Sequence, residues 1–233
     1  MAEEGSQHEG CRSWHRSTMA DHAEEMARQI AAVFESHPEL ADHRQAHPWL
    51  TGWLGDPAAK TWLVSENPSA TQVDRIHSAA ATPESQWAAS RGDRLLREAL
   101  VEHGLKTGTA SGPGGWRCYL TNVMKSEVFV KDWNGTTAAQ QLAVAEAWAP
   151  VLRHELEAGD PQVLVVLGQK AERALKHLER NRLIPWLPPI HRIHHYSYVM
   201  HRPDSRRGLG PGDPTRQREW RAALGEAAQP PVN

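Results

Sequence analysis

Cysteine is scarce in this chain of 233 residues, which contains only Cys11 and Cys118, far apart in sequence. Two distant cysteines form neither a C-x-x-C pair nor a disulfide framework, so we expect a reduced, cytoplasmic protein. Long apolar runs are also missing, because no stretch approaches the roughly 20 apolar residues of a membrane span. The start of the chain is acidic and polar rather than basic and then apolar. We therefore expect neither export nor membrane insertion.

An overall excess of one charge is absent as well, since the formal net charge is −2. No global field therefore favours nucleic acid as a partner, but the charge is uneven along the chain. Residues 1–36 carry seven acidic side chains against three arginines, whereas residues 191–221 carry seven arginines against three acidic side chains. The basic C-terminal part is able to face phosphate groups.

Strand and helix patterns alternate along the sequence. Buried strands are predicted at 61–65, at 116–124 with its end at Asn122, at 162–168 and at 190–197. Helices are predicted from a cap at Asp21 to His37, and at 84–103, 136–157, 169–181 and 214–228. The continuous apolar run at 162–168 indicates a strand that is buried on both faces. The alternation predicts an α/β fold, a three-layer α/β/α arrangement around a four-stranded, mostly parallel sheet.

The length of the chain fits one domain with a full core. We expect a flexible tail at 1–18 and a single domain at 19–233. Within that domain we distinguish an N-terminal helical part, a core that carries the motifs and a last helix, which span 19–57, 58–205 and 214–228.

The first predicted strand, T-W-L-V-S, runs directly into a turn with the sequence E-N-P-S. Ligands of α/β proteins bind outside the carboxyl ends of parallel strands, so Glu66 and Asn67 would lie at the mouth of a site. Pro68 restricts the backbone just after them. The alternative is an ordinary strand exit with Asn-Pro turn chemistry.

Four segments in the same order resemble motifs of the uracil-DNA glycosylase superfamily, most closely the branch that usually carries an iron–sulfur cluster. The motifs of that branch are G-E-x-P-G, Y-I-T-N-V-V-K, V-V-V-x-L-G-x-x-A and H-P-S. The corresponding segments are S-E-N-P-S at 65–69, Y-L-T-N-V-M-K at 119–125, V-L-V-V-L-G-Q-K-A at 163–171 and H-Y-S at 195–197. The resemblance covers 58–205. It implies a monomeric, monofunctional DNA glycosylase that flips a pyrimidine out of DNA and hydrolyses its N-glycosidic bond, leaving an abasic site.

The resemblance assigns roles to individual residues. Glu66 and Asn67 would orient or activate the attacking water, and Glu66 is the better base because a neutral amide takes no proton. Asn122 would read the base edge, and its amide offers both a donor and an acceptor, which fits uracil or cytosine. The alternative for Asn122 is a buried asparagine that caps a strand end. His195 would donate a hydrogen bond to O2 of the departing base.

Further residues are matched to the DNA. Trp87 would stack on the extruded base, although a tryptophan near a helix start is also often core. The side chains that would meet phosphates or enter the duplex are Ser197, Lys125, Met200, His201, Arg202, Arg206 and Arg207, with Met200 or His201 as the wedge. Metal binding is the alternative for the histidines at 191, 194, 195 and 201, but no cysteine or acid completes a known spacing there, and we expect no metal.

The chain departs from the motifs in informative ways. An iron–sulfur cluster needs four thiolates, and Ser126 stands where the branch has one of them, so we expect no cluster and no other cofactor. Ser65 replaces a glycine and Tyr196 replaces the proline of H-P-S. Ser69 stands where the most uracil-selective branch has a tyrosine that blocks substituents at C5 of the base. The open C5 side leads to the hypothesis of a modified cytosine as substrate, such as glucosylated hydroxymethylcytosine of phage DNA.

Two alternatives concern the activity itself. A lysine that captured the sugar as a Schiff base would add strand cleavage, and Lys125 and Lys170 are the amines to test, although we expect no such step. A non-catalytic module that binds uracil or a modified base in DNA is the alternative to an enzyme.

Overall fold

The computed structural model describes residues 11–40, 44–45, 55–68, 90–112, 114–127, 135–184 and 187–229. For residues 11–23, 44–45 and 127 it describes the backbone only. Ser69 and Trp87 lie outside the described residues.

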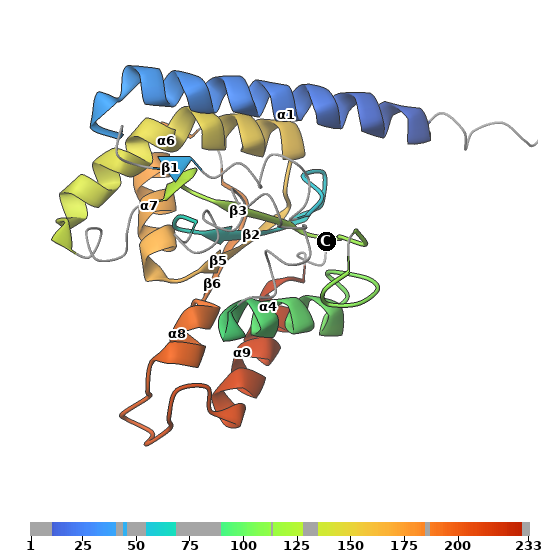
Figure 1. Cartoon of the computed structure of the whole chain (residues 1–233), viewed down its shortest axis with the longest axis vertical. Helices are drawn as coiled ribbons and strands as arrows, with labels where there is room; N and C mark the ends of the chain where they lie inside the picture. The colour runs from blue at the N-terminus through green and yellow to red at the C-terminus, as the bar shows by residue number, and fades with distance from the viewer. Residues whose placement is uncertain are drawn as a thin grey trace, which may run out of the picture.

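A four-stranded sheet lies at the centre of the molecule (Figure 1). Its strands are β3 (Tyr119–Asn122), β2 (Thr61–Ser65), β5 (Val163–Leu167) and β6 (Ile190–Ile193), in that spatial order. Every pairing is parallel, and the register places Ser65 beside Asn122 and Leu167 beside Ile193. The carboxyl ends of all four strands therefore lie at one edge of the sheet.

Helices cover both faces of this sheet, as the three-layer prediction required. One face is covered by α4 (Arg91–Glu102), α8 (Tyr196–His201) and α9 (Pro214–Ala227). The other is covered by α6 (Ala138–Gly159) and α7 (Gln169–Arg180), with α1 (Cys11–Ser36) lying along α6 (Figure 1). A short 3-10 helix, η1 (Pro38–Leu40), and an antiparallel pair, β1 (Arg44–Gln45) with β4 (Ser126–Glu127), complete the described elements. The α/β prediction is confirmed.

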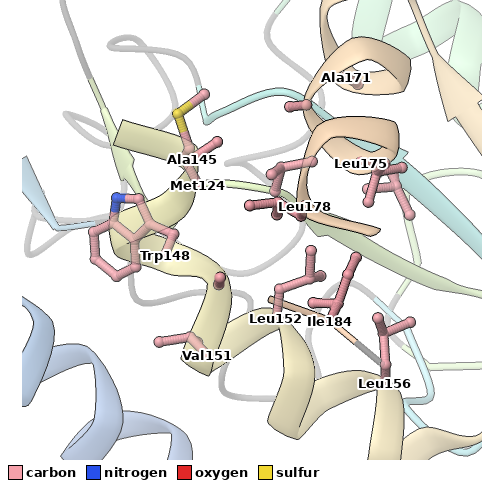
Figure 2. Close-up of a cluster of buried hydrophobic side chains, with 14 of the residues drawn as sticks. Met124, Ala145, Trp148, Val151, Leu152, Leu156, Ala171, Leu175, Leu178 and Ile184 are labelled. Atoms are coloured by element: carbon pink, nitrogen blue, oxygen red, sulfur yellow. The ribbon is translucent and has the colours of Figure 1, made fainter. Parts of the chain in front are cut away.

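Alternate residues of the strands supply two hydrophobic clusters, one on each face. Trp62 and Val64 of β2 belong to the cluster beneath α1, α6 and α7, whereas Leu63 belongs to the cluster beneath α4, α8 and α9. Figure 2 shows the first cluster, to which Leu152 and Leu156 of α6 and Leu178 of α7 belong. Each such side chain contributes about 1.5 to 3 kcal/mol when fully buried. The clusters explain the apolar centre of β2 and the continuous apolar run of β5, which is buried at every position.

Three predicted boundaries are wrong. The strand predicted from residue 116 begins only at Tyr119. The first helix begins at Cys11 rather than after a cap at Asp21, so residues 11–18 of the predicted tail belong to α1. Residues 11–20 contain neither glycine nor proline, so nothing in them ends the helix. The fourth strand ends at Ile193 rather than at residue 197, because His195 caps the short helix α8.

Candidate active site

The connections of the sheet diverge between β2 and β5, and we call the region outside the carboxyl ends of these two strands the crevice. The chain passes from β2 outward to β3 on one side and from β5 outward to β6 on the other. The carboxyl edge between β2 and β5 is therefore the topological switch point, where α/β proteins bind ligands. Glu66 and Asn67 follow β2, and Gly168 follows β5. All four motif segments predicted from the sequence meet at this edge.

Asn122 is the last residue of β3, and its side chain is a buried group without a partner. The residue is 2 % exposed, and its Nδ2 finds no hydrogen-bond acceptor among the described residues. Alternation along β3 puts it on the side of Leu120, whose cluster lies beneath α4 and α8. A buried donor that stays unsatisfied costs about 1 to 3 kcal/mol. An acceptor atom of a ligand in the crevice would remove that cost.

His195 follows β6 and is held by the first turn of α8. The backbone N–H of Ser197 donates to His195 Nδ1 at 3.2 Å, and Ser197 Oγ lies 2.7 Å from the same nitrogen. Burial lowers the pKa of His195 to about 4, so the ring is neutral at pH 7. Because Nδ1 accepts the backbone N–H, the single ring proton is on Nε2. The residue is therefore a neutral donor, suited to an oxygen that gains negative charge.

Gly168, between β5 and α7, presents no side chain to His195. Its φ is +99°, which other residues rarely adopt, and a Cβ at this position would lie 3.6 Å from His195 Cβ. Its N–H donates to the Ile193 carbonyl at 2.9 Å. The end of β5 is thus tied to the segment that leads into His195.

The turn at Glu66 and Asn67 is tied to the exit of β3. The carbonyls of Ser65 and Glu66 accept the N–H groups of Val123 and Met124 at 2.9 and 3.0 Å, so the pairing of the strands continues past their ends. Asn67 Nδ2 donates to the Pro68 carbonyl at 3.1 Å. The side chains of Glu66 and Asn67 are both partly buried. Their backbone is thereby fixed relative to Asn122.

Tyr196, which replaces the motif proline, packs beside His195. The two ring centroids are 4.2 Å apart, and the phenol is hydrogen-bonded to Asp93 in the first turn of α4. Burial raises the pKa of Asp93, which is 6 % exposed. A Cβ on Gly92 would lie 2.9 Å from Tyr196 Cδ2, so only glycine allows this close approach. Helix α4 therefore supports His195 through Tyr196.

The predicted contact between Lys125 and phosphate is wrong. Its side chain is 1 % exposed, and its Nζ lies 2.5 Å from Glu155 Oε2 inside the protein. Burial lowers the pKa of Lys125, while the carboxylate of Glu155 acts in the opposite direction. A buried amine that already has acceptors is unable to reach DNA in this conformation.

Some of the residues after His195 that are predicted to contact DNA are exposed to solvent. His201, Arg202 and Arg206 are exposed. Arg207 is also exposed, but its guanidinium forms two short contacts with Glu219, at 2.6 and 2.7 Å. Met200 packs against the cluster beneath α8 and α9, which leaves His201 as the exposed candidate for a wedge.

Ser197 has a different partner from the one expected. A hydroxyl has one proton, and donating it to His195 Nδ1 leaves none for a phosphate oxygen. The phosphate contact of Ser197 therefore remains a prediction that would require this hydrogen bond to open. The predicted roles of Ser69 and Trp87 lie outside the described residues.

Sequence reasoning missed Glu155, Gly92, Asp93 and Gly168. A signal for Glu155 exists, because it occupies a helical position whose neighbours on the same face are Trp148, Val151 and Leu152. An acidic residue in such a stripe needs a buried partner.

Metal binding and membrane insertion find no support in the described part of the chain. No three side chains of histidine, cysteine, aspartate or glutamate there gather closely enough to hold a metal ion. None of the helices in this part is both long and apolar enough to cross a membrane.

The fold is a three-layer α/β fold, and it places a buried amide and a neutral imidazole at one edge of a parallel sheet. The family comparison makes this more specific. The uracil DNA glycosylase superfamily matches residues 53–220, and the chain belongs to this superfamily. Its members act on DNA and are generally N-glycosylases. A search of the curated proteins found no match.

Proposed function

We propose that the protein is a monofunctional DNA N-glycosylase. It takes one pyrimidine nucleotide out of DNA, binds the base at the carboxyl edge of the sheet, and hydrolyses the bond between base and sugar. The observation that carries the proposal is the unpartnered, buried Nδ2 of Asn122 at the same sheet edge as the neutral His195. We further propose that it acts as a monomer in the cytoplasm and without a cofactor.

The departing base is stabilised by His195. When the glycosidic bond breaks, its electron pair stays with the base, which leaves as an anion, and the sugar becomes an oxocarbenium ion. His195 Nε2–H donates to O2 of the base, where negative charge gathers in the transition state. Because the pKa of His195 is lowered to about 4, the ring donates this hydrogen bond as a neutral group.

The attacking water is bound by the turn after β2. Asn67 Oδ1 accepts a hydrogen bond from the water, and the Glu66 carboxylate accepts its proton as the new bond to the sugar forms. The turn is held by the backbone hydrogen bonds of Ser65 and Glu66 to the exit of β3. The products are the free base and an abasic site.

The substrate is uracil or a cytosine modified at C5. The Asn122 amide pairs with either pyrimidine, because rotation of the amide exchanges its donor and acceptor. By the resemblance of the motifs, Ser69 stands where the most uracil-selective branch has a tyrosine that blocks C5 substituents. We propose that glucosylated hydroxymethylcytosine of phage DNA is the natural substrate and that its excision defends the cell against phage.

The test is base release from oligonucleotides that contain uracil, 5-hydroxymethylcytosine or its glucosylated form. We expect abasic sites in the glucosylated substrate, strand cleavage only after alkali treatment, and no covalent product with borohydride. Equal or exclusive cleavage at uracil would contradict the modified substrate. Tight binding without release of any base would contradict the enzyme and favour a non-catalytic module.

A further inference from the structure

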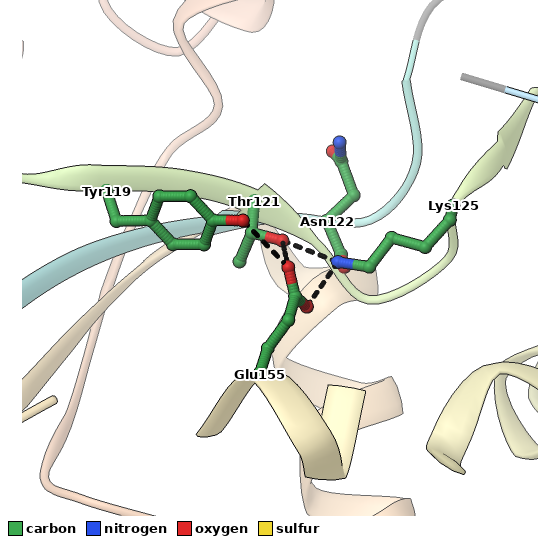
Figure 3. A network of polar contacts seen from close by, with 5 residues as sticks. All are labelled: Tyr119, Thr121, Asn122, Lys125 and Glu155. Carbon is green, nitrogen blue, oxygen red and sulfur yellow. Dashed lines mark hydrogen bonds and ion pairs between the residues drawn. The ribbon is translucent and has the colours of Figure 1, made fainter. Parts of the chain in front are cut away.

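A buried polar network lies behind Asn122, on the opposite side of β3 from the crevice (Figure 3). Its centre is the carboxylate of Glu155 on α6, whose side chain is 0 % exposed. Glu155 Oε1 accepts hydrogen bonds from the Tyr119 hydroxyl at 3.0 Å and the Thr121 hydroxyl at 2.9 Å. Glu155 Oε2 accepts one from Lys125 Nζ at 2.5 Å. The carboxylate is fully satisfied inside the protein.

The ammonium of Lys125 is satisfied in the same way. It has three N–H donors, and three acceptors surround it. Besides Glu155, these are Thr121 Oγ1 at 2.5 Å and the main-chain carbonyl of Asn122 at 2.7 Å. Every hydrogen of the ammonium is thus used, and one of them holds the backbone of the residue that carries the unpartnered amide.

Stability alone does not explain a buried ion pair at this place. The desolvation of two charges is costly, and well-packed apolar residues in their place are often neutral or stabilising. Apolar residues would, however, leave the Asn122 carbonyl without the Lys125 donor. The carbonyl and the side chain of Asn122 share one Cα, so fixing the carbonyl constrains the direction of the Cα–Cβ bond that carries the amide.

Figure 3 shows that the amide of Asn122 points away from Lys125 and Glu155. The network therefore does not contact the amide, and it acts on Asn122 only through the backbone carbonyl. Past the strand end, the next N–H groups of the chain, those of Val123 and Met124, donate to Ser65 and Glu66. The turn after β3 is therefore held to β2 through the N–H groups of Val123 and Met124. It is held to α6 through Lys125, which bonds both the Asn122 carbonyl and Glu155.

We propose that Lys125, anchored by Glu155, is a positioning residue that aims the Asn122 amide at the base in the crevice. The inference rests on the proposed function, in which Asn122 reads the base. Lys125 touches neither the substrate nor the reacting atoms, and it acts through the backbone of Asn122.

The test compares a double variant, Lys125→Met with Glu155→Gln, with the wild type. The double variant removes both charges and keeps an acceptor for the hydroxyls of Tyr119 and Thr121, so we expect it to fold. It takes the donor away from the Asn122 carbonyl. A misplacement of about 1 Å at a reacting centre costs on the order of 10²-fold. We therefore expect kcat for base release to fall by about that factor, with KM for duplex DNA nearly unchanged.

Thr121→Val is the matched control. It removes a hydroxyl from the same network and keeps the hydrogen bond between Lys125 and Asn122. We expect a lower melting temperature and a kcat near that of the wild type. An equal fall of kcat in Thr121→Val and in the double variant would overturn the proposal, because the network would then serve stability alone. A double variant that does not fold would overturn it for the same reason.

A second readout does not depend on activity. The side-chain amide signal of Asn122 in a nitrogen-15 NMR spectrum, assigned by its loss in Asn122→Asp, reports the order of this group. We expect one sharp pair of signals in the wild type and in Thr121→Val, and broadened or multiple signals in the double variant. Unchanged signals in the double variant would overturn the positioning role. If the wild type releases no base, the proposed function fails, and this comparison still decides whether Lys125 positions Asn122.

Discussion

His195 shows how a single residue is prepared by its surroundings. Burial disfavours the charged ring, and the backbone N–H of Ser197 selects the tautomer with its proton on Nε2. Both effects come from the few residues that begin α8. A histidine in this setting works as a hydrogen-bond donor over the whole physiological range of pH.

The lowered pKa of His195 predicts a pH dependence of stability. In the unfolded chain the ring gains a proton near its ordinary pKa of 6.5, whereas in the folded protein it does so only near pH 4. Between these values the unfolded state binds more protons, so the free energy of unfolding falls as the pH falls. The loss reaches roughly 3 kcal/mol at most, since each pKa unit is worth about 1.4 kcal/mol.

Urea denaturation at several pH values between 7 and 4 measures this effect. His195→Asn is the control, because asparagine is able to cap α8 and does not titrate. The wild type should lose more stability than the variant over this range. Equal losses in the two proteins would show that His195 is not held neutral.

At the scale of elements, the contact between α4 and α8 supports the site. Gly92 allows the Tyr196 ring to lie directly on α4, and Asp93 binds its hydroxyl. Ser90 caps α4 by accepting the N–H of Asp93 at 2.9 Å, so the supporting helix begins at the contact itself. The tyrosine that replaces the motif proline is thus built into the support of His195.

Gly92→Ala is expected to disturb this contact. The added methyl group would come within about 3 Å of the ring, so Tyr196 and His195 must shift away from α4. We expect kcat for base release to fall by on the order of 10-fold or more, because the imidazole donor is displaced. Arg94→Ala, on the exposed side of the same helix, is the control and should leave kcat unchanged. A wild-type rate in Gly92→Ala would show that the contact does not position His195.

The elements also show which features a local pattern is able to predict. The strand at 163–167 was predictable because its burial on both faces appears in its own residues. The start of α8 at Tyr196 was not, because it depends on a side chain of His195 that turns back to the backbone. The pairing of Lys125 with Glu155 was not predictable either, because Lys125 lies in the turn after β3 and Glu155 lies on α6, thirty residues away.

For the whole molecule, the sheet order explains why four distant segments form one site. Of the two outer strands, β3 ends with Asn122 and β6 is followed by His195, and Glu66 and Gly168 follow the two inner strands. The motifs could be predicted to meet because parallel strands end at a common edge. The strand order itself, and with it the crevice between β2 and β5, needed the structure.

The basic charge of residues 191–221 is largely engaged within the protein. Arg192, Arg207 and Arg221 pair with carboxylates, and the buried Arg216 donates to the Arg202 carbonyl. In the part of the chain that the structure describes, Arg202, Arg206 and Arg218 are exposed and form no ion pair. Local charge counts therefore overstate the surface that is open to DNA.

Mass spectrometry of the bases released from unmodified and differently modified phage genomes tests the central claim most directly. The wild type should release a free pyrimidine base from at least one of these DNAs. Asn122→Ala and His195→Ala should release it on the order of 10² times more slowly or not at all, because the base then loses its contact or its donor. Release of no base from any DNA, or release at the wild-type rate by both variants, would contradict the account.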